Sequence, residues 1–317
     1  MAGRFARDDE VEAWQEDGWA LLDGLVATEE IDTASADLRY VFPTPEKFHA
    51  DPEAHRPPGR STAELRRGYP EMPATGPAFR PEQHRFSGQF PFYGSGALSR
   101  LCVHPAIVDF MERALETADL RVYQTQVSAK YAGDANFEQP MHTDRNHSFL
   151  PPRMEPPWWH VESFLYLTDV DEGTASTHLV PNGDAVGRSR NSIFMPDGDP
   201  ALYAHERAAA GRRGSLLVYR PDVFHRGVDL TRPGGYRFLL NVSYKVAGQD
   251  WVGYHSVQSN ATHPSWVQFV EGSTPRELEL FGFPPPGHPV WTDALVDATT
   301  EKYPKLDVEP WRRALRR

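Results

Sequence analysis

The chain of 317 residues carries 33 Lys and Arg against 44 Asp and Glu, which gives a formal net charge of −11 at pH 7. This acidic balance argues against nucleic acid and against an anionic membrane surface as partners. A single cysteine, Cys102, excludes a disulfide framework and a cysteine-based zinc site, and because no apolar run has membrane-spanning length and no signal peptide opens the chain, we expect a cytoplasmic protein.

Helix caps and apolar spacing predict a helical N-terminal part. Asp9 and Glu12 are spaced as a capping box for a first helix, and Gly18 is placed to end it. After a short apolar strand over 19–22, Thr28 is placed to cap a second helix. Both helices precede any motif with recognisable chemistry.

Residues 42–96 are rich in proline, which excludes long helices and central strands there. Aromatic residues such as Phe79, Phe86 and Phe92 are interspersed among the prolines, whereas a pure linker would lack them. We therefore predict an ordered loop region packed on the domain, and a role as a lid over a site stays open. A helix over 104–116 follows, with its apolar residues at helical spacing.

Short strands separated by turn-forming residues dominate the middle of the chain. They cover residues 121–131, 161–168, 177–180, 215–219 and 236–246. Asp199 begins a helix that we expect to end near Gly211, and Thr274 and Thr292 open helices in the tail. Many short strands with flanking helices indicate an all-β core with flanking helices (α+β), an antiparallel double-stranded β-helix or cupin-like jelly-roll barrel.

Two of the strands alternate clearly between faces. In 121–131 one face holds Gln124, Gln126, Ser128 and Lys130, and the other holds Tyr123, Val127 and Ala129. The polar face is either solvated or lines a polar cavity. In 236–246 the aromatic and β-branched residues share one face and Arg237 lies on the other. The turn at 232–235 is expected to pair this strand with 215–220, which would bring Arg237 close to His225.

His142 and Asp144 stand two residues apart in an extended segment, so their side chains point to the same face. Two ligands hold a metal ion poorly, and His225 is our third. Two histidines and one carboxylate on one face of a metal, with the opposite positions open, are typical of non-haem Fe(II) oxygenases. The sequence therefore predicts an iron site at these three residues.

Two rival motifs have the same spacing. They are His49-Ala50-Asp51 and His160-Val161-Glu162. The first has no strand to hold it, which lowers its value as a metal motif. For any one of these histidines taken singly, the alternative is a solvated or hydrogen-bonded side chain.

Arg237 lies on the inward face of the predicted barrel and needs an anion there. Its planar guanidinium suits a carboxylate in bidentate geometry. An internal Asp or Glu is the alternative partner. The tryptophan pair Trp158 and Trp159 is expected to contact a substrate.

The motifs occur in an order that resembles the phytanoyl-CoA dioxygenase family of Fe(II)/2-oxoglutarate oxygenases. The order is His142-x-Asp144, Gly173 before Leu179-Val180-Pro181, then His225 and Arg237, and the opening from Trp14 to Ile31 is similar as well. The resemblance covers most of the chain. With it we expect a single domain over 1–317, made of N-terminal helices and the proline-rich loop (1–120), a jelly-roll core (121–246) and a helical tail (247–317).

The resemblance implies that His142, Asp144 and His225 bind Fe(II) and that Arg237 holds the distal carboxylate of 2-oxoglutarate. Lys130 is a weaker match to a cosubstrate contact, and Gln126 is assigned with it. One departure is Gly227, where some members of the family have Ser to help hold that carboxylate. The reaction implied is hydroxylation of a small molecule by dioxygen with release of succinate and CO2. The carboxylate at Asp144 makes halogenation unexpected.

Two other classes of function remain open from the sequence. One is a zinc metallohydrolase that uses the same His142, Asp144 and His225, and it gives Arg237 no role. The other is a non-catalytic jelly-roll binding protein. The sequence leaves the primary substrate and the oligomeric state open.

Overall fold

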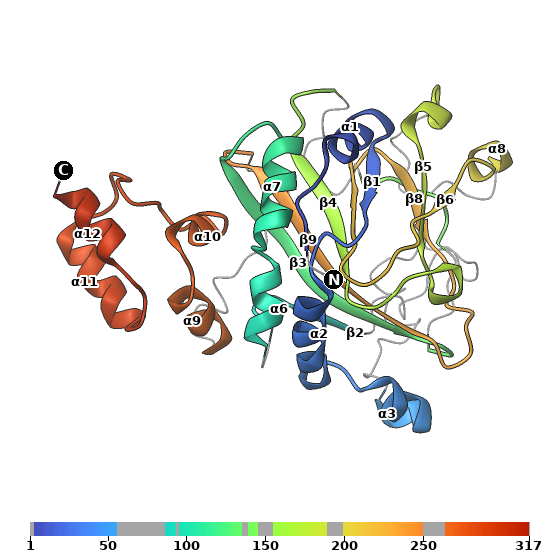
Figure 1. Cartoon of the computed structure of the whole chain (residues 1–317), viewed down its shortest axis with the longest axis horizontal. Helices are drawn as coiled ribbons and strands as arrows, with labels where there is room; N and C mark the ends of the chain where they lie inside the picture. The colour runs from blue at the N-terminus through green and yellow to red at the C-terminus, as the bar shows by residue number, and fades with distance from the viewer. Residues whose placement is uncertain are drawn as a thin grey trace, which may run out of the picture.

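The computed structural model describes residues 3–55, 86–92, 95–134, 139–144, 155–188, 199–249 and 264–316. Within these ranges the strands form two antiparallel sheets (Figure 1). The larger has the order β1 (Trp19–Leu22), β7 (Leu216–Tyr219), β4 (His160–Tyr166), β9 (Tyr236–Val246), β3 (Leu120–Tyr131) and β2 (Phe86–Gln89). The smaller has the order β6 (Arg207–Ala208), β5 (Thr177–Val180) and β8 (Phe224–Gly227).

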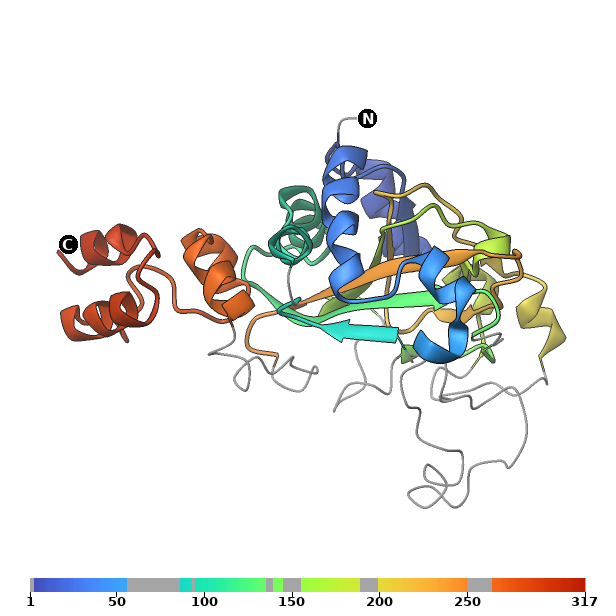
Figure 2. The same cartoon turned by 90° about the horizontal axis from the view of Figure 1, so that it is seen from below.

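Helices cover one face of the larger sheet (Figures 1 and 2). They are α1 (Asp8–Asp17), α2 (Thr28–Ala36), α6 (Gly96–Leu101) and α7 (Pro105–Ala114). Their apolar residues form one buried cluster with the sheet, in which Trp14 of α1 and Phe110 of α7 join Leu240 of β9. We call this face of the sheet the outer face.

The remaining helices lie along the edges of this body and at its C-terminal end. They are the 3-10 helix η1 (Asp37–Tyr40), α3 (Pro45–Ala50), α4 (Pro52–His55), α8 (Pro200–Tyr203), α9 (Pro264–Glu271), α10 (Pro275–Glu279), α11 (Asp293–Lys302) and α12 (Glu309–Leu315), while the short 3-10 helices η4 (Glu172–Thr174) and η5 (Asn182–Ala185) stand before and after β5 in the chain. Helices α11 and α12 extend away from the sheets (Figure 1). Among the described residues, none of these helices is both long and apolar enough to span a bilayer.

The inner face of the larger sheet packs against the smaller one through a second apolar cluster. This cluster joins Leu217 of β7 and Leu239 of β9 to Leu179 of β5. Its members come mainly from β1, β4 and β7, whereas the inner face of β3 contributes none of them. The inner face is therefore apolar on one half and polar on the other.

Strand β9 confirms the alternation read from the sequence. Phe238, Leu240, Val242 and Tyr244 belong to the outer-face core, and Arg237, Asn241, Ser243 and Lys245 face inward. The predicted neighbour is wrong, because β9 pairs with β3 and β4, while 216–219 pairs with β1 and β4. Alternation fixes the face of a side chain but not the neighbouring strand, and the turn at 232–235 leads from the smaller sheet into the larger one.

Strand β3 contains a bulge that the alternation could not show. The register against β9 shifts between Val122 and Gln124. Tyr123 is therefore turned to the inner face, where its hydroxyl contacts Glu162. The prediction that Tyr123 shares a face with Val127 is wrong. A bulge adds one residue to one strand and re-aims the side chain that it carries.

Several predicted ends of helices also shift. In α1 the Glu10 carboxylate, and not that of Glu12, accepts from the Arg7 backbone, while Gly18 ends the helix with φ 83° as expected. Helix α2 begins at Thr28, whose side chain makes no cap. Helix α8 stops at Tyr203, well before the predicted end, because the chain returns to extended structure in β6.

The predicted lid falls largely outside the described residues, since 56–85 are not among them. What is described on either side is compact structure. Phe48 of α3, and Phe90 and Phe92 after β2, are buried in the outer-face core.

Candidate metal centre

The three predicted ligands lie together. Each of His142, Asp144 and His225 offers one ligand atom, and these atoms all lie within 4.8 Å of one another. Among the described residues this is the one group of His, Cys, Asp and Glu side chains arranged to hold a metal ion. The spacing read from the sequence therefore corresponds to a real cluster.

Backbone pairing places the two imidazoles side by side. His142 and His225 form an antiparallel bridge, with N···O distances of 3.0 and 2.8 Å between the two residues. Their ring centroids are 4.3 Å apart. A short segment after β3 is thus hydrogen-bonded to β8, which sets the distance between the two ligands independently of any metal.

Hydrogen bonds also fix which ring nitrogen is available. Nδ1 of His142 lies 2.9 Å from the Pro140 carbonyl oxygen, and Nδ1 of His225 lies 3.0 Å from that of Val223. Because a carbonyl oxygen only accepts, each Nδ1 carries a hydrogen, so Nε2 is the ring nitrogen that each imidazole can offer to a metal. The Nε2 atoms face the Asp144 carboxylate at 3.9 and 3.4 Å. This donor set fits a divalent metal bound through two neutral imidazoles and one carboxylate.

Tyr219 was not predicted as a site residue, yet it touches two of the ligands. Its hydroxyl donates to Oδ2 of Asp144 at 3.0 Å, and its ring centroid lies 4.7 Å from that of His225. Burial raises the pKa of Tyr219 well above its usual value, so the hydroxyl keeps its proton. Its position in a four-residue apolar strand, Leu-Leu-Val-Tyr, gave no signal of this contact.

A second carboxyl group lies beside the centre on the inner face. Glu162 of β4 accepts hydrogen bonds from the hydroxyls of Tyr123 and Ser243, the latter at 2.8 Å. Burial raises the pKa of Glu162 to about 7, and the nearby charge of Asp144 adds to this shift. The sequence pointed to Glu162 only as part of a rival metal motif.

Neither rival motif supplies a ligand to the cluster. His160 is buried on the inner face edge-on to the Tyr123 ring, and burial lowers its pKa to about 4. His49 lies in α3 and packs against the Tyr131 ring, with centroids 6.4 Å apart. Both are therefore packed histidines in this structure.

A pair of buried cations lies on the same inner face. Arg237 of β9 stands directly opposite Lys130 of β3 in the antiparallel register. Arg237 donates to the Ala175 carbonyl oxygen, and within the described residues it has no ion pair and the Lys130 ammonium has no hydrogen bond. The internal carboxylate considered as an alternative partner of Arg237 is thus not found in the described part of the chain.

Electrostatics make this pair strained in the absence of an anion. Burial lowers the pKa of Lys130 to about 7, and the charge of Arg237 contributes to the shift while that of Asp229 opposes it. Burial also lowers the pKa of Arg237 to about 10. Two buried charges of the same sign repel each other at low dielectric, so an anion between them would be strongly favoured.

Gly227 connects the cation pair to the metal centre. Its N–H donates to Oε1 of Gln139 at 3.0 Å, and the Gln139 N–H donates back to the Gly227 carbonyl at 2.8 Å. A Cβ atom at position 227 would lie 3.3 Å from that Oε1 and 3.8 Å from the Lys130 ammonium nitrogen. The Lys130 ammonium therefore lies beside the space that a side chain at position 227 would occupy.

Two further predicted residues are placed as follows. Gln126 is half-buried opposite Asn241 on the polar half of the inner face, and its amide makes no hydrogen bond within the described residues. Trp158 does not face the site. It packs edge-on against Trp14 in the outer-face core at 5.1 Å between centroids, with the Arg220 guanidinium over its ring.

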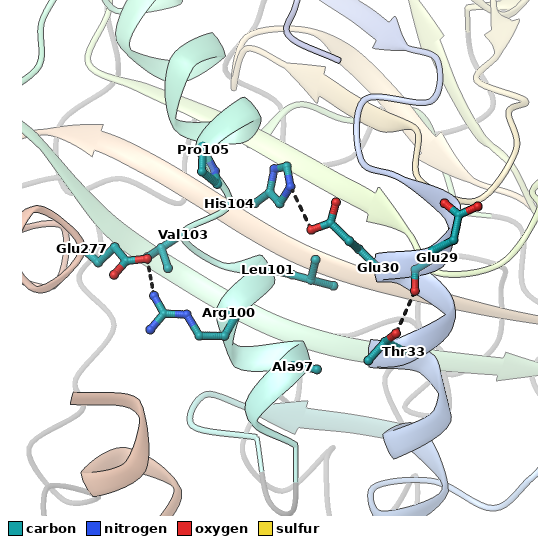
Figure 3. Close-up of a pocket in the computed structure, with 10 residues that line it drawn as sticks. All are labelled: Glu29, Glu30, Thr33, Ala97, Arg100, Leu101, Val103, His104, Pro105 and Glu277. Atoms are coloured by element: carbon teal, nitrogen blue, oxygen red, sulfur yellow. Dashed lines mark hydrogen bonds and ion pairs between the residues drawn. The ribbon is translucent and has the colours of Figure 1, made fainter. Parts of the chain in front are cut away.

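A separate pocket of about 460 Å³ lies among the helices on the outer side (Figure 3). Its lining comes from α2, α6, the start of α7 and Glu277 of α10. Arg100 in its lining forms an ion pair with Glu277, and Nε2 of His104 lies 3.3 Å from the Glu30 carboxylate. None of the predicted site residues lines this pocket.

The comparisons identify a shared fold. No protein-family model matches the chain, and no curated protein matches it in sequence. The chain is similar in structure to the non-heme alpha ketoglutarate dependent carbocyclase SnoK from nogalamycin biosynthesis, with TM-score 0.55 and 16% identity over 82% of this chain and 93% of that one. It is also similar to the epimerase SnoN from the same biosynthesis (TM-score 0.53, 16% identity, 76% and 83% covered) and to AviO1 from Streptomyces viridochromogenes Tue57 (0.53, 15%, 78% and 98%). At this identity the likeness shows a shared fold.

Proposed function

We propose that the protein is an Fe(II)- and 2-oxoglutarate-dependent oxygenase of the phytanoyl-CoA dioxygenase type, acting on a small molecule. The observation that carries this proposal is the combination of two buried sites, one of metal-binding side chains and one of cations. The His142, Asp144 and His225 cluster fits a metal, and the buried pair of Lys130 and Arg237 fits a carboxylate. A metal-binding keto acid with a second carboxylate at its far end would satisfy both.

The chain's own residues divide the work in this proposal. His142, Asp144 and His225 hold the metal, and Arg237 with Lys130 holds the distal carboxylate of 2-oxoglutarate. When bound, ferrous iron supplies the activation of dioxygen coupled to decarboxylation of the keto acid to succinate and CO2, with hydroxylation of the substrate. All three ligand side chains are almost fully buried, which keeps bulk water away from the reacting groups.

The fold supports the same proposal. Two facing antiparallel sheets with the metal ligands between them correspond to a double-stranded β-helix, and the three parts of the chain, 1–120, 121–246 and 247–317, are proposed to form one domain. SnoN was crystallised in complex with Fe3+, alpha ketoglutarate and nogalamycin RO. This is consistent with a metal, a keto acid and a small-molecule substrate as the partners of the fold.

A zinc metallohydrolase is the second candidate, because the donor set alone would also hold zinc. It leaves the cation pair without a role. A buried ammonium and guanidinium facing each other without a carboxylate are costly, and we regard them as the feature that distinguishes the two functions.

Anaerobic titration tests the proposal. Adding Fe(II) and then 2-oxoglutarate to the purified protein should produce a weak visible charge-transfer band, and exposure to oxygen should release succinate. His142→Ala should abolish the band, and His49→Ala, which alters a histidine of a rival motif, should leave it intact. Metal binding without any such band, together with oxygen-independent hydrolysis, would favour the hydrolase.

A further inference from the structure

The packing of the Tyr219 ring holds its hydroxyl in one position. The Tyr219 ring is stacked near Phe164 at 5.9 Å between centroids and tilted against His225 at 4.7 Å. It is 2% exposed, and β7 is paired on both sides, with β1 and with β4. Because both faces of the ring are packed, the side chain cannot turn to another hydrogen-bond partner unless a strand moves.

In this position the hydroxyl contacts a proposed metal ligand, Asp144. The hydroxyl donates to Oδ2 of Asp144 at 3.0 Å, and the same oxygen is 3.4 Å from Nε2 of His225. A carboxylate at a metal can rotate about its terminal bond and bind through one oxygen or through both. A buried donor on one oxygen removes that freedom, since rotation would break the hydrogen bond.

We infer that Tyr219 is a positioning residue for the metal centre, whose hydroxyl holds the Asp144 carboxylate in the orientation in which it gives one oxygen to the metal. The consequence of this orientation for catalysis rests on the proposed function. A carboxylate that binds through one oxygen leaves a metal position open for the cosubstrate or dioxygen. In this role Tyr219 acts through Asp144.

The neighbouring tyrosine supports this assignment by contrast. Tyr123 is also buried on the same face, but its hydroxyl donates to Glu162, and Ser243 donates to the other oxygen of that carboxyl. The two tyrosines therefore serve different carboxyl groups. Tyr123→Phe is a matched control for Tyr219→Phe, because each variant removes one buried hydroxyl from the inner face of the larger sheet.

The experiment measures Co(II) binding by the metal-free protein, in competition with a chelating dye, together with the visible spectrum of the Co(II) complex. Outer partners of metal ligands typically contribute about 10- to 100-fold to metal affinity. Tyr219→Phe should weaken Co(II) binding by about that factor and change the Co(II) spectrum. Tyr123→Phe should stay within about threefold of the wild type with an unchanged spectrum.

A second set of variants separates positioning from a general loss of structure. In an Asp144→Gly background the Tyr219 hydroxyl has no ligand to hold, so adding Tyr219→Phe should leave the weakened Co(II) affinity unchanged. An equal further loss in that background would overturn the inference, as would wild-type affinity and spectrum in the single variant. Co(II) binding needs neither 2-oxoglutarate nor oxygen, so these results stand apart from the test of the oxygenase activity.

Discussion

Raising the pH should weaken the binding of 2-oxoglutarate through one side chain, Lys130. Its pKa is lowered to about 7 by burial and by the charge of Arg237. Below this pH both cations are present and bind the distal carboxylate together. Above it Lys130 is neutral, and binding the dianion requires that a proton be taken up, so the apparent affinity falls with rising pH.

The size of the effect follows from the protonated fraction. With a pKa near 7, roughly three quarters of Lys130 is charged at pH 6.5 and about 3% at pH 8.5, so the affinity should fall by about 25-fold over this interval. Arg237 stays charged throughout, because its pKa is about 10. The dissociation constant is measured by anaerobic titration of 2-oxoglutarate into the Fe(II) protein.

Lys130→Met is the control, since it keeps the apolar stem and removes the titrating group. Its affinity should be low at every pH and almost flat between pH 6.5 and 8.5. Co(II) titrations without keto acid, run at the same pH values, report any change in the metal site itself. A wild-type affinity that does not depend on pH, or a variant that keeps the wild-type slope, would refute the reasoning.

Three other variants address neighbouring residues. Arg237→Met should weaken 2-oxoglutarate binding by about 100-fold, in line with a lost charge-assisted contact, and leave Co(II) affinity intact. A loss of Co(II) affinity with unchanged 2-oxoglutarate binding would mean that another residue holds the distal carboxylate. Gly227→Ala brings a Cβ to 3.3 Å from Oε1 of Gln139, so we expect weaker binding of the keto acid in titration, and unchanged binding would show that the loop adjusts freely. Because the pKa of Glu162 is raised to about 7, its contribution to the stability of the metal-free protein is present at low pH and is lost as the pH rises through 7. In chemical denaturation, the free energy of unfolding of Glu162→Gln should therefore depend less on pH between pH 5 and 8 than that of the wild type. An unchanged pH dependence would contradict the assignment.

The ligand cluster could be predicted because its signal is local. His142 and Asp144 are two residues apart in extended chain, and the ordered resemblance selected His225 from 13 histidines. The faces of β9 followed equally directly from alternation. Rivals were harder to reject from sequence, since His160 does lie on the inner face, and only its position in the sheet shows that it is packed and not a ligand.

The residues that the sequence missed depend on register. Tyr219 of β7 contacts Asp144, whose segment is bridged to β8, and Tyr123 reaches Glu162 because β3 contains a bulge. Neither fact is encoded in the alternation of one strand, which would place Tyr123 on the apolar face. The pairing of β9 with β3 is a further case, since it sets Arg237 opposite Lys130 and creates the cation pair.

The cation pair also bears on which keto acid the site would accept. Burial lowers the pKa of both Lys130 and Arg237, and for Lys130 the charge of Arg237 adds to the shift, so placing the two cations together is unfavourable without an anion. A keto acid with one carboxylate, such as pyruvate, would bind at the metal and leave this repulsion in place. A keto acid with a second carboxylate at the right distance relieves it and restores the proton on Lys130. Selectivity for a diacid would thus arise from the repulsion between the two cations as much as from the contacts made with the bound diacid.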